Sequence, residues 1–62
     1  MNNLKKTLKQ QGITQTSFAK VMGCSKQAVN YWVNGKTMPS TKRMKNISEY
    51  LKVSIEKLFF KD

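Results

Sequence analysis

The amino-acid sequence predicts an all-α protein, a compact bundle of five short helices in a single domain over residues 1–62. Apolar residues recur three and four positions apart, which is the period of an amphipathic helix and not the alternation of a strand. The pattern is interrupted at Gly12, Gly23, Gly35 and Pro39, where helices are expected to end. Hydrophobic residues make up 39% of the chain, which allows one small core.

The first helix is predicted over residues 3–11. Leu4 and Leu8 lie one turn apart in it and are expected to face inward, with lysines on the outer face. Either Asn2 or Asn3 can cap the first turn.

Two short helices joined by a tight turn are predicted over residues 15–22 and 25–33. Phe18 and Ala19 fall on the inner face of the first of these helices. Gly23 can take the positive φ that a sharp turn needs. A side chain as small as that of Ala19 would let the two helices approach closely.

Hydroxyl residues precede both helices of this pair. Thr14 and Ser25 are the expected N-caps. Val29 and Trp32 follow at helical spacing on the inner face, so Trp32 is predicted to be a core residue and not an exposed aromatic.

The last two helices begin after their own caps. Pro39 prevents an early restart of the chain as helix, and Ser40 is expected to cap a helix over residues 41–51. Ser54 is expected to cap the fifth helix. The inward-facing residues of the two helices are predicted to be Met44, Ile47, Leu51, Ile55, Leu58 and Phe59.

Two adjacent aromatic residues, Phe59 and Phe60, close the fifth helix. They cannot both face one core from a short helix, so an exposed aromatic is expected there. A dimer contact at the Phe59–Phe60 end is one interpretation. The other is a single exposed apolar residue without a role.

The charge balance restricts the classes of function. Twelve lysines and arginines against three acids give a net charge of +9, which indicates a polyanion partner, either nucleic acid or anionic lipid. The chain has no histidine and its acids are scattered, so we expect no catalytic residues, metal site, cofactor or enzymatic activity. Without a long apolar run or a signal-peptide pattern, we expect a cytoplasmic protein that does not enter a membrane.

The only cysteine of the chain, Cys24, lies in the turn beside Gly23. One cysteine cannot form an internal disulfide. Cys24 is expected to be a small buried hydrophobe, and a redox role for it stays open.

The stretch TQTSFAKVMGCSKQAVNYWVNG resembles the helix-turn-helix domains of phage repressors, Cro proteins and related bacterial regulators. The resemblance rests on Ala19, Gly23 and Val29 in register, then on the Trp32 to Gly35 exit, and it extends loosely through the last two helices. It implies a lambda-repressor-like fold and a sequence-specific transcriptional regulator, with most similarity to a Cro-type phage repressor. Such a protein would bind double-stranded DNA as a homodimer on a pseudo-palindromic operator.

The resemblance makes the helix over residues 25–33 the expected recognition helix in the major groove. Gln27 can bond bidentately with the N6/N7 edge of adenine. Lys26 is expected to donate to guanine or to neutralise a phosphate, and Tyr31 to touch a thymine methyl or a phosphate. The predicted base-contacting residues are Ser25, Lys26, Gln27, Tyr31 and, at the rim, Asn30.

Phosphate contacts are expected around this helix. Gln15 begins the preceding helix, where free backbone N–H groups and the helix dipole favour an anion, and the matching family residue often contacts the DNA backbone. The predicted phosphate-contacting residues are Gln15, Asn34, Lys36, Lys42 and Arg43. Lys5 and Lys6 are further candidates for salt-dependent attraction.

Several alternatives remain at the level of sequence. Small regulators of restriction-modification or toxin-antitoxin operons are close to the Cro-type interpretation. An RNA-binding or protein-binding module on the same fold is a second class, although most aromatics fall on inner faces and not where bases would stack. A cationic membrane-surface peptide is a third, opposed by the glycine and proline breaks.

Overall fold

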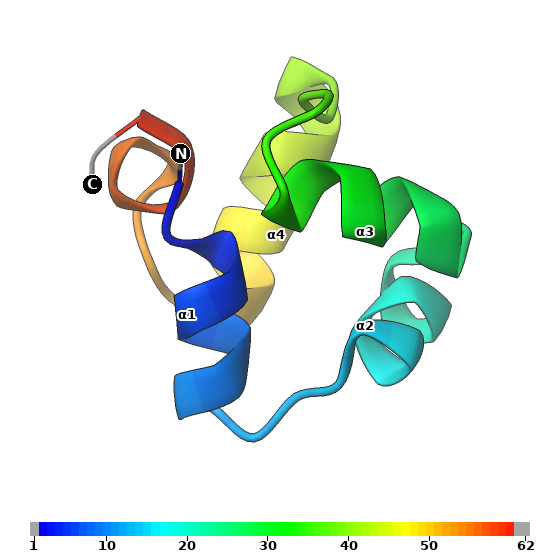
Figure 1. The fold of residues 1–62 in the computed structure, drawn as a ribbon. Coiled ribbons are helices and arrows are strands. Elements are labelled where there is room, and N and C mark those ends of the chain that lie inside the picture. Colours follow the sequence, from blue (N-terminus) through cyan, green and yellow to red (C-terminus); the bar gives the residue numbers. More distant parts are fainter. Residues whose placement is uncertain (1, 61–62) are drawn as a thin grey trace.

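The computed structural model describes residues 2–60 and shows five helical segments around one hydrophobic core (Figure 1). The α-helices are α1 (Leu4–Gln10), α2 (Gln15–Met22), α3 (Lys26–Val33) and α4 (Thr41–Leu51), followed by a short π-helical segment, η1 (Glu56–Phe60). No strand occurs in this part of the chain. The predicted all-α bundle, with a helix-turn-helix formed by the second and third helices, is confirmed.

The helices α2, α3 and α4 and the segment η1 begin at the predicted caps. The side-chain oxygens of Thr14, Ser25 and Ser40 each accept a hydrogen bond from the backbone N–H three residues further on. The hydroxyl of Ser54 does the same before η1. Each cap satisfies a first-turn N–H that has no partner inside its helix. The predicted starts of these helices therefore agree with the structure to within one residue.

Glycines in the left-handed conformation end α2 and α3. The φ angles are 70° at Gly23 and 74° at Gly35, a region that glycine enters without a steric penalty. After α3, the N–H of Gly35 donates to the carbonyl of Trp32. The next N–H, that of Lys36, donates to the carbonyl of Tyr31. This pair of bonds is a Schellman motif, and it turns the following loop back beside the last turn of α3.

The core lies where the inner faces of all five segments meet. Ala19 on α2 is 4% exposed and Trp32 on α3 is 7% exposed, so both predicted core positions are confirmed. Cys24 is half-buried and packs against this core. The buried apolar residues are Leu4, Leu8, Phe18, Ala19, Val29, Trp32, Val33, Ile47, Leu51, Leu58 and Phe59.

Amide side chains join segments that are far apart in the sequence. The Nδ2 of Asn2 donates to the carbonyl of Trp32 at 2.9 Å, while its Oδ1 accepts from the first N–H of α1. The Nδ2 of Asn3 donates to a carbonyl of η1, also at 2.9 Å. At the other end of α1, the Nε2 of Gln11 donates to the carbonyl of Leu51 at 2.9 Å. These bonds hold α1 against α3, η1 and α4.

Two local conformations differ from the expected helices. Lys52, directly after α4, has a φ of 60°, a left-handed conformation without glycine. The fifth helix is wound more widely than an α-helix. Leu58 and Phe59, which are adjacent in this segment, are both buried in the core.

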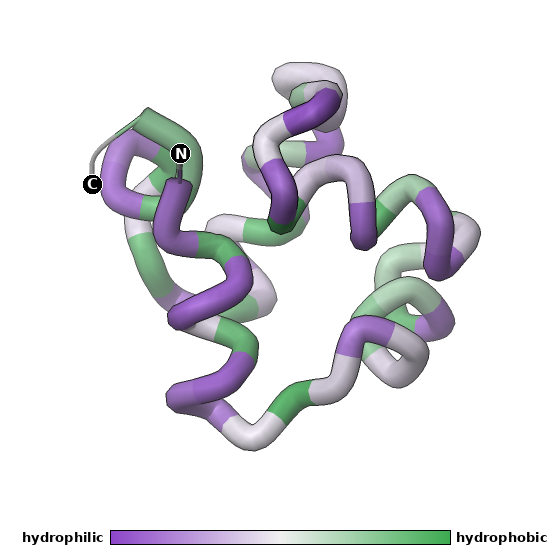
Figure 2. The backbone as a smooth tube through the Cα atoms, viewed as in Figure 1, coloured by the Kyte–Doolittle hydropathy of each residue, from purple (hydrophilic) through white to green (hydrophobic). Residues whose placement is uncertain are grey.

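Each helix carries both hydrophobic and hydrophilic positions, as Figure 2 shows. In the part of the chain that the structure describes, no helix is long and apolar enough to cross a membrane.

Candidate nucleic-acid interface

The outer face of α3 carries the side chains that were predicted to contact bases. They are Ser25, Lys26, Gln27, Asn30 and Tyr31, all exposed except Tyr31, which is half-buried. The opposite face of α3 is occupied by its core residues. Because α3 contains no acidic residue, this outer face offers amide, ammonium and phenol groups without a carboxylate to repel an anion.

Tyr31 contacts two other residues of the predicted interface, Gln27 and Lys36. Gln27 and Tyr31 lie one turn apart on α3, and the Nε2 of Gln27 donates to the Tyr31 hydroxyl at 2.9 Å. The Nζ of Lys36 lies 5.4 Å from the centroid of the Tyr31 ring, at cation–π distance. Lys36 in the loop after α3 is therefore linked through Tyr31 to Gln27 on the outer face of α3.

Asn34 and Arg43, two of the predicted phosphate contacts, are engaged inside the protein. The Nδ2 of Asn34 donates to the carbonyl of Asn30 at the end of α3. The guanidinium of Arg43 donates to the carbonyl of Met22 and lies over the Trp32 ring, 5.9 Å from its centroid. Both side chains therefore have partners within the protein, and their contacts with phosphate stay predictions.

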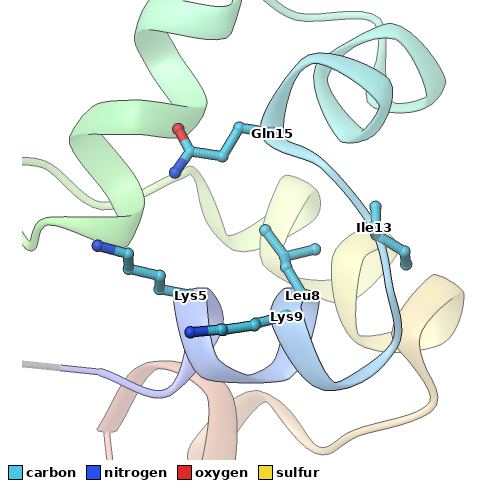
Figure 3. Close-up of a pocket in the computed structure, with 5 residues that line it drawn as sticks. All are labelled: Lys5, Leu8, Lys9, Ile13 and Gln15. Carbon is cyan, nitrogen blue, oxygen red and sulfur yellow. The ribbon is translucent and has the colours of Figure 1, made fainter.

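A shallow hollow of about 230 Å³ lies between α1 and the start of α2. In Figure 3, Lys5 and Lys9 extend from α1 and Gln15 from the start of α2, and their nitrogen-bearing ends lie on the same side of the hollow. Lys5 and Lys9 also line a second hollow of about 400 Å³, which reaches Val33 at the end of α3. The basic side chains of α1 thus adjoin both helices of the helix-turn-helix.

Lys9 is a candidate phosphate contact that the sequence interpretation missed. Its spacing of four from Lys5 places both on one face of α1, a signal that was available. The sequence did not show which side of α1 would face Gln15.

Another hollow, of about 240 Å³, lies at the start of α4 and is lined by Ser40, Lys42, Arg43 and Asn46. Lys42 and Asn46 are exposed here, whereas Arg43 is half-buried and donates to the Met22 carbonyl. Asn46 was not predicted, because it lies well inside the fourth helix and away from the loop that is expected to run along the DNA backbone.

The helix termini have an unusual distribution of charge. None of the first turns of α1 to α4 contains an acidic residue, although the positive end of a helix dipole favours one. Lys26 and Lys42 instead add positive charge near the starts of α3 and α4. Within the protein this arrangement is unfavourable, but it strengthens the attraction of these helix ends for an anion.

The comparison with known proteins agrees with this geometry. A family model described as helix-turn-helix matches residues 4–58, nearly the whole of the described chain. The chain belongs to the helix-turn-helix family of phage repressors and Cro proteins. No curated protein matches the sequence.

Family membership makes this helix-turn-helix protein a DNA-binding transcription regulator. The predicted partner, DNA, is confirmed at this level. Within residues 2–60, no group of three or more His, Cys, Asp or Glu side chains is placed to hold a metal ion.

The aromatic pair at the end of the helix-turn-helix protein is divided between core and surface. Phe59 is 4% exposed and Phe60 is 63% exposed. Phe59 therefore packs within its own chain, and a dimer contact at this end would depend on Phe60. Tyr50 is also exposed, and its ring lies 6.2 Å from that of Phe18.

Proposed function

We propose that this helix-turn-helix protein is a sequence-specific regulator of the Cro type, which represses transcription by binding a pseudo-palindromic operator in double-stranded DNA. The observation that carries the proposal is the outer face of α3, where hydrogen-bonding side chains converge without an acid. The resemblance of residues 14–35 to Cro proteins supports the Cro type. Action on DNA supports a cytoplasmic location.

The contacts divide into two kinds. Ser25, Lys26, Gln27 and Tyr31 would meet base edges, and Asn30 would lie at the rim. Gln15, Lys36 and Lys42 would meet phosphates, joined by Lys5 and Lys9 on α1. Phosphate contacts supply affinity and fix the orientation of α3, whereas the base contacts supply the sequence preference.

We further propose that two copies bind together, since one small domain with a single recognition helix reads few base pairs. Two recognition helices on half-sites about 34 Å apart would double the number of base pairs that are read. Phe60, 63% exposed, is the side chain that supports a contact between the copies. The proposal includes no catalytic role, because the chain has no histidine and only three acidic residues.

Selection from a randomised duplex pool at two salt concentrations tests this function. We expect enrichment of a pseudo-palindrome whose half-sites lie about one helical turn apart. Retention without enrichment, lost steeply as salt rises, would mean that the +9 charge alone binds nucleic acid and would overturn base readout. Matching the enriched site to a phage operator would support the Cro type, whereas a restriction-modification or toxin-antitoxin promoter would replace it.

A further inference from the structure

We propose that Tyr31 is a positioning residue that makes Gln27 select adenine over guanine. The proposal rests on the proposed function, because it concerns how α3 would read a base. It adds a role for the Tyr31 hydroxyl that does not depend on Tyr31 touching DNA itself.

The geometry begins with the hydrogen bond between the two side chains. The Nε2 of Gln27 donates to the Tyr31 hydroxyl at 2.9 Å across one turn of α3. Gln27 is exposed and Tyr31 is half-buried, so the tyrosine is the better anchored member of the pair. A glutamine with three free side-chain torsions loses much of its freedom when one end is fixed in this way.

The Tyr31 ring is itself held by the loop. The left-handed Gly35 brings Lys36 back onto the last turn of α3, where the Lys36 N–H donates to the Tyr31 carbonyl at 2.9 Å. The same residue places its Nζ 5.4 Å from the centroid of the Tyr31 ring. The Lys36 backbone thus fixes the main chain at Tyr31, and its side chain lies over the ring that carries the hydroxyl bonded to Gln27.

The hydrogen-bonding groups that remain free on the Gln27 amide then determine which base it prefers. A glutamine side chain has two N–H donors and one carbonyl acceptor. Tyr31 occupies one N–H, which leaves the carbonyl and the other N–H. Adenine presents an N6–H donor beside the N7 acceptor and matches this pair, whereas guanine presents two acceptors, O6 and N7. Facing guanine, the Gln27 carbonyl would meet another acceptor and lose a bond.

The test uses base selection by three variants and the native protein. Gln27→Ala first identifies the position that Gln27 reads, as the position where the base preference disappears. Binding to duplexes with adenine or guanine at that position is then measured for the native protein and for Tyr31→Phe, which keeps the ring and removes the hydroxyl. Tyr50→Phe is the matched control, since it removes an exposed hydroxyl of α4.

We expect the native protein to prefer adenine over guanine by about tenfold or more. In Tyr31→Phe this ratio should fall to roughly threefold or less, because the amide can then rotate and offer both N–H donors to guanine. The melting temperature of Tyr31→Phe should not change, and Tyr50→Phe should keep the native ratio.

Two results would overturn the inference while leaving the proposed function intact. A native preference for guanine at the Gln27 position would mean that the Tyr31 hydroxyl donates to the Gln27 carbonyl. An unchanged ratio in Tyr31→Phe would mean that Gln27 is positioned by other groups. If the native protein selects no sequence at all, the proposed function fails first, and this inference fails with it.

Discussion

Arg43 connects three separate helices through its side chain. From the first turn of α4 it reaches the carbonyl of Met22 at the end of α2 and covers the Trp32 ring of α3. It thereby spans the helix-turn-helix and the helix that follows it. Its position after a loop in a basic chain also predicts a phosphate contact, and that contact stays a prediction.

Replacement of Arg43 by alanine should therefore affect folding more than DNA binding. We expect Arg43→Ala to lower the free energy of unfolding by about 1–3 kcal/mol, since a charged donor and a cation–π contact are both lost. Lys42→Ala, at the exposed neighbouring position, should change it by less than about 0.5 kcal/mol. Urea denaturation measures both values. Equal stability of the two variants would show that Arg43 does not fasten α4 to the helix-turn-helix.

Replacement of Gln27 by alanine should instead affect DNA binding more than folding. Its side chain is exposed, so Gln27→Ala should leave the free energy of unfolding within about 0.5 kcal/mol of the native value. The affinity for the selected operator should fall by about 1–3 kcal/mol, and that for unrelated DNA should stay the same. Equilibrium binding to the two duplexes separates these effects. An equal loss on both would mean that Gln27 contacts the backbone and does not read a base.

At the scale of the element, local signals allowed most helix boundaries to be predicted. A hydroxyl cap and a positive-φ glycine act through bonds to residues three to five positions away, so Thr14, Ser25, Gly23 and Gly35 could be interpreted from their neighbours alone. The inner faces followed from helical spacing for the same reason.

The parts that could not be predicted depend on contacts between distant segments. Nothing near Asn2 or Gln11 in the sequence indicates that their amides bond to Trp32 and Leu51. The same holds for the side of α1 that faces Gln15 and for the partners of Arg43. Such contacts form only after the helices have packed, so spacing along one helix contains no information about them.

Lys52 was missed for a different reason. Its φ of 60° is adopted without the glycine that usually marks a helix end, and its N–H donates to the Ser48 carbonyl at 2.8 Å. A side chain in this region is unfavourable by roughly 1–2 kcal/mol. The hydrogen bonds at the C-terminal end of α4 therefore hold Lys52 in a conformation that a lysine at this position would not predict.

Lys52→Gly should stabilise the protein for this reason. We expect the free energy of unfolding to rise by about 0.5–1 kcal/mol, because relief of the left-handed strain exceeds the greater freedom of glycine in the unfolded chain. Lys45→Gly, which removes the same charge from an exposed position inside α4, should lower it by about 1 kcal/mol. Thermal and urea unfolding give both values. A loss of stability in both variants would contradict strain at Lys52.

The crossing of α2 and α3 provides a second test at this scale. Ala19 is buried, with 4% of its surface exposed, so Ala19→Leu should lower the free energy of unfolding by about 1–3 kcal/mol through overpacking. Ser17→Leu adds a similar side chain at an exposed position of α2 and should cost much less. Thermal unfolding of both variants measures the difference. Unchanged stability in Ala19→Leu would mean that the helices have room at this position.

At the scale of the whole molecule, the important property is where the positive charge lies. The net charge of +9 ensures a salt-dependent attraction to DNA, but it does not identify the residues that meet phosphates. The hollows along α1 place Lys5 and Lys9 beside Gln15, whereas Lys57 lines a hollow on another side of α1 with Gln10. The lysines should therefore differ in their effect on DNA binding although their charges are equal.

The dependence of binding on salt can measure this difference. The slope of log affinity against log salt falls by about 1 for each phosphate contact removed. We expect Lys5→Ala and Lys9→Ala each to reduce the slope by about this amount, and Lys57→Ala to leave it nearly unchanged. Titration of a fixed duplex at four or more salt concentrations, roughly from 50 to 200 mM, gives the slopes. Equal reductions for all three lysines would mean that the protein attracts DNA through its diffuse charge and that α1 has no place at the interface. A reduction confined to Lys5 and Lys9 would instead place the start of α2 and the adjoining face of α1 along one DNA strand, with α3 directed into the groove beside it.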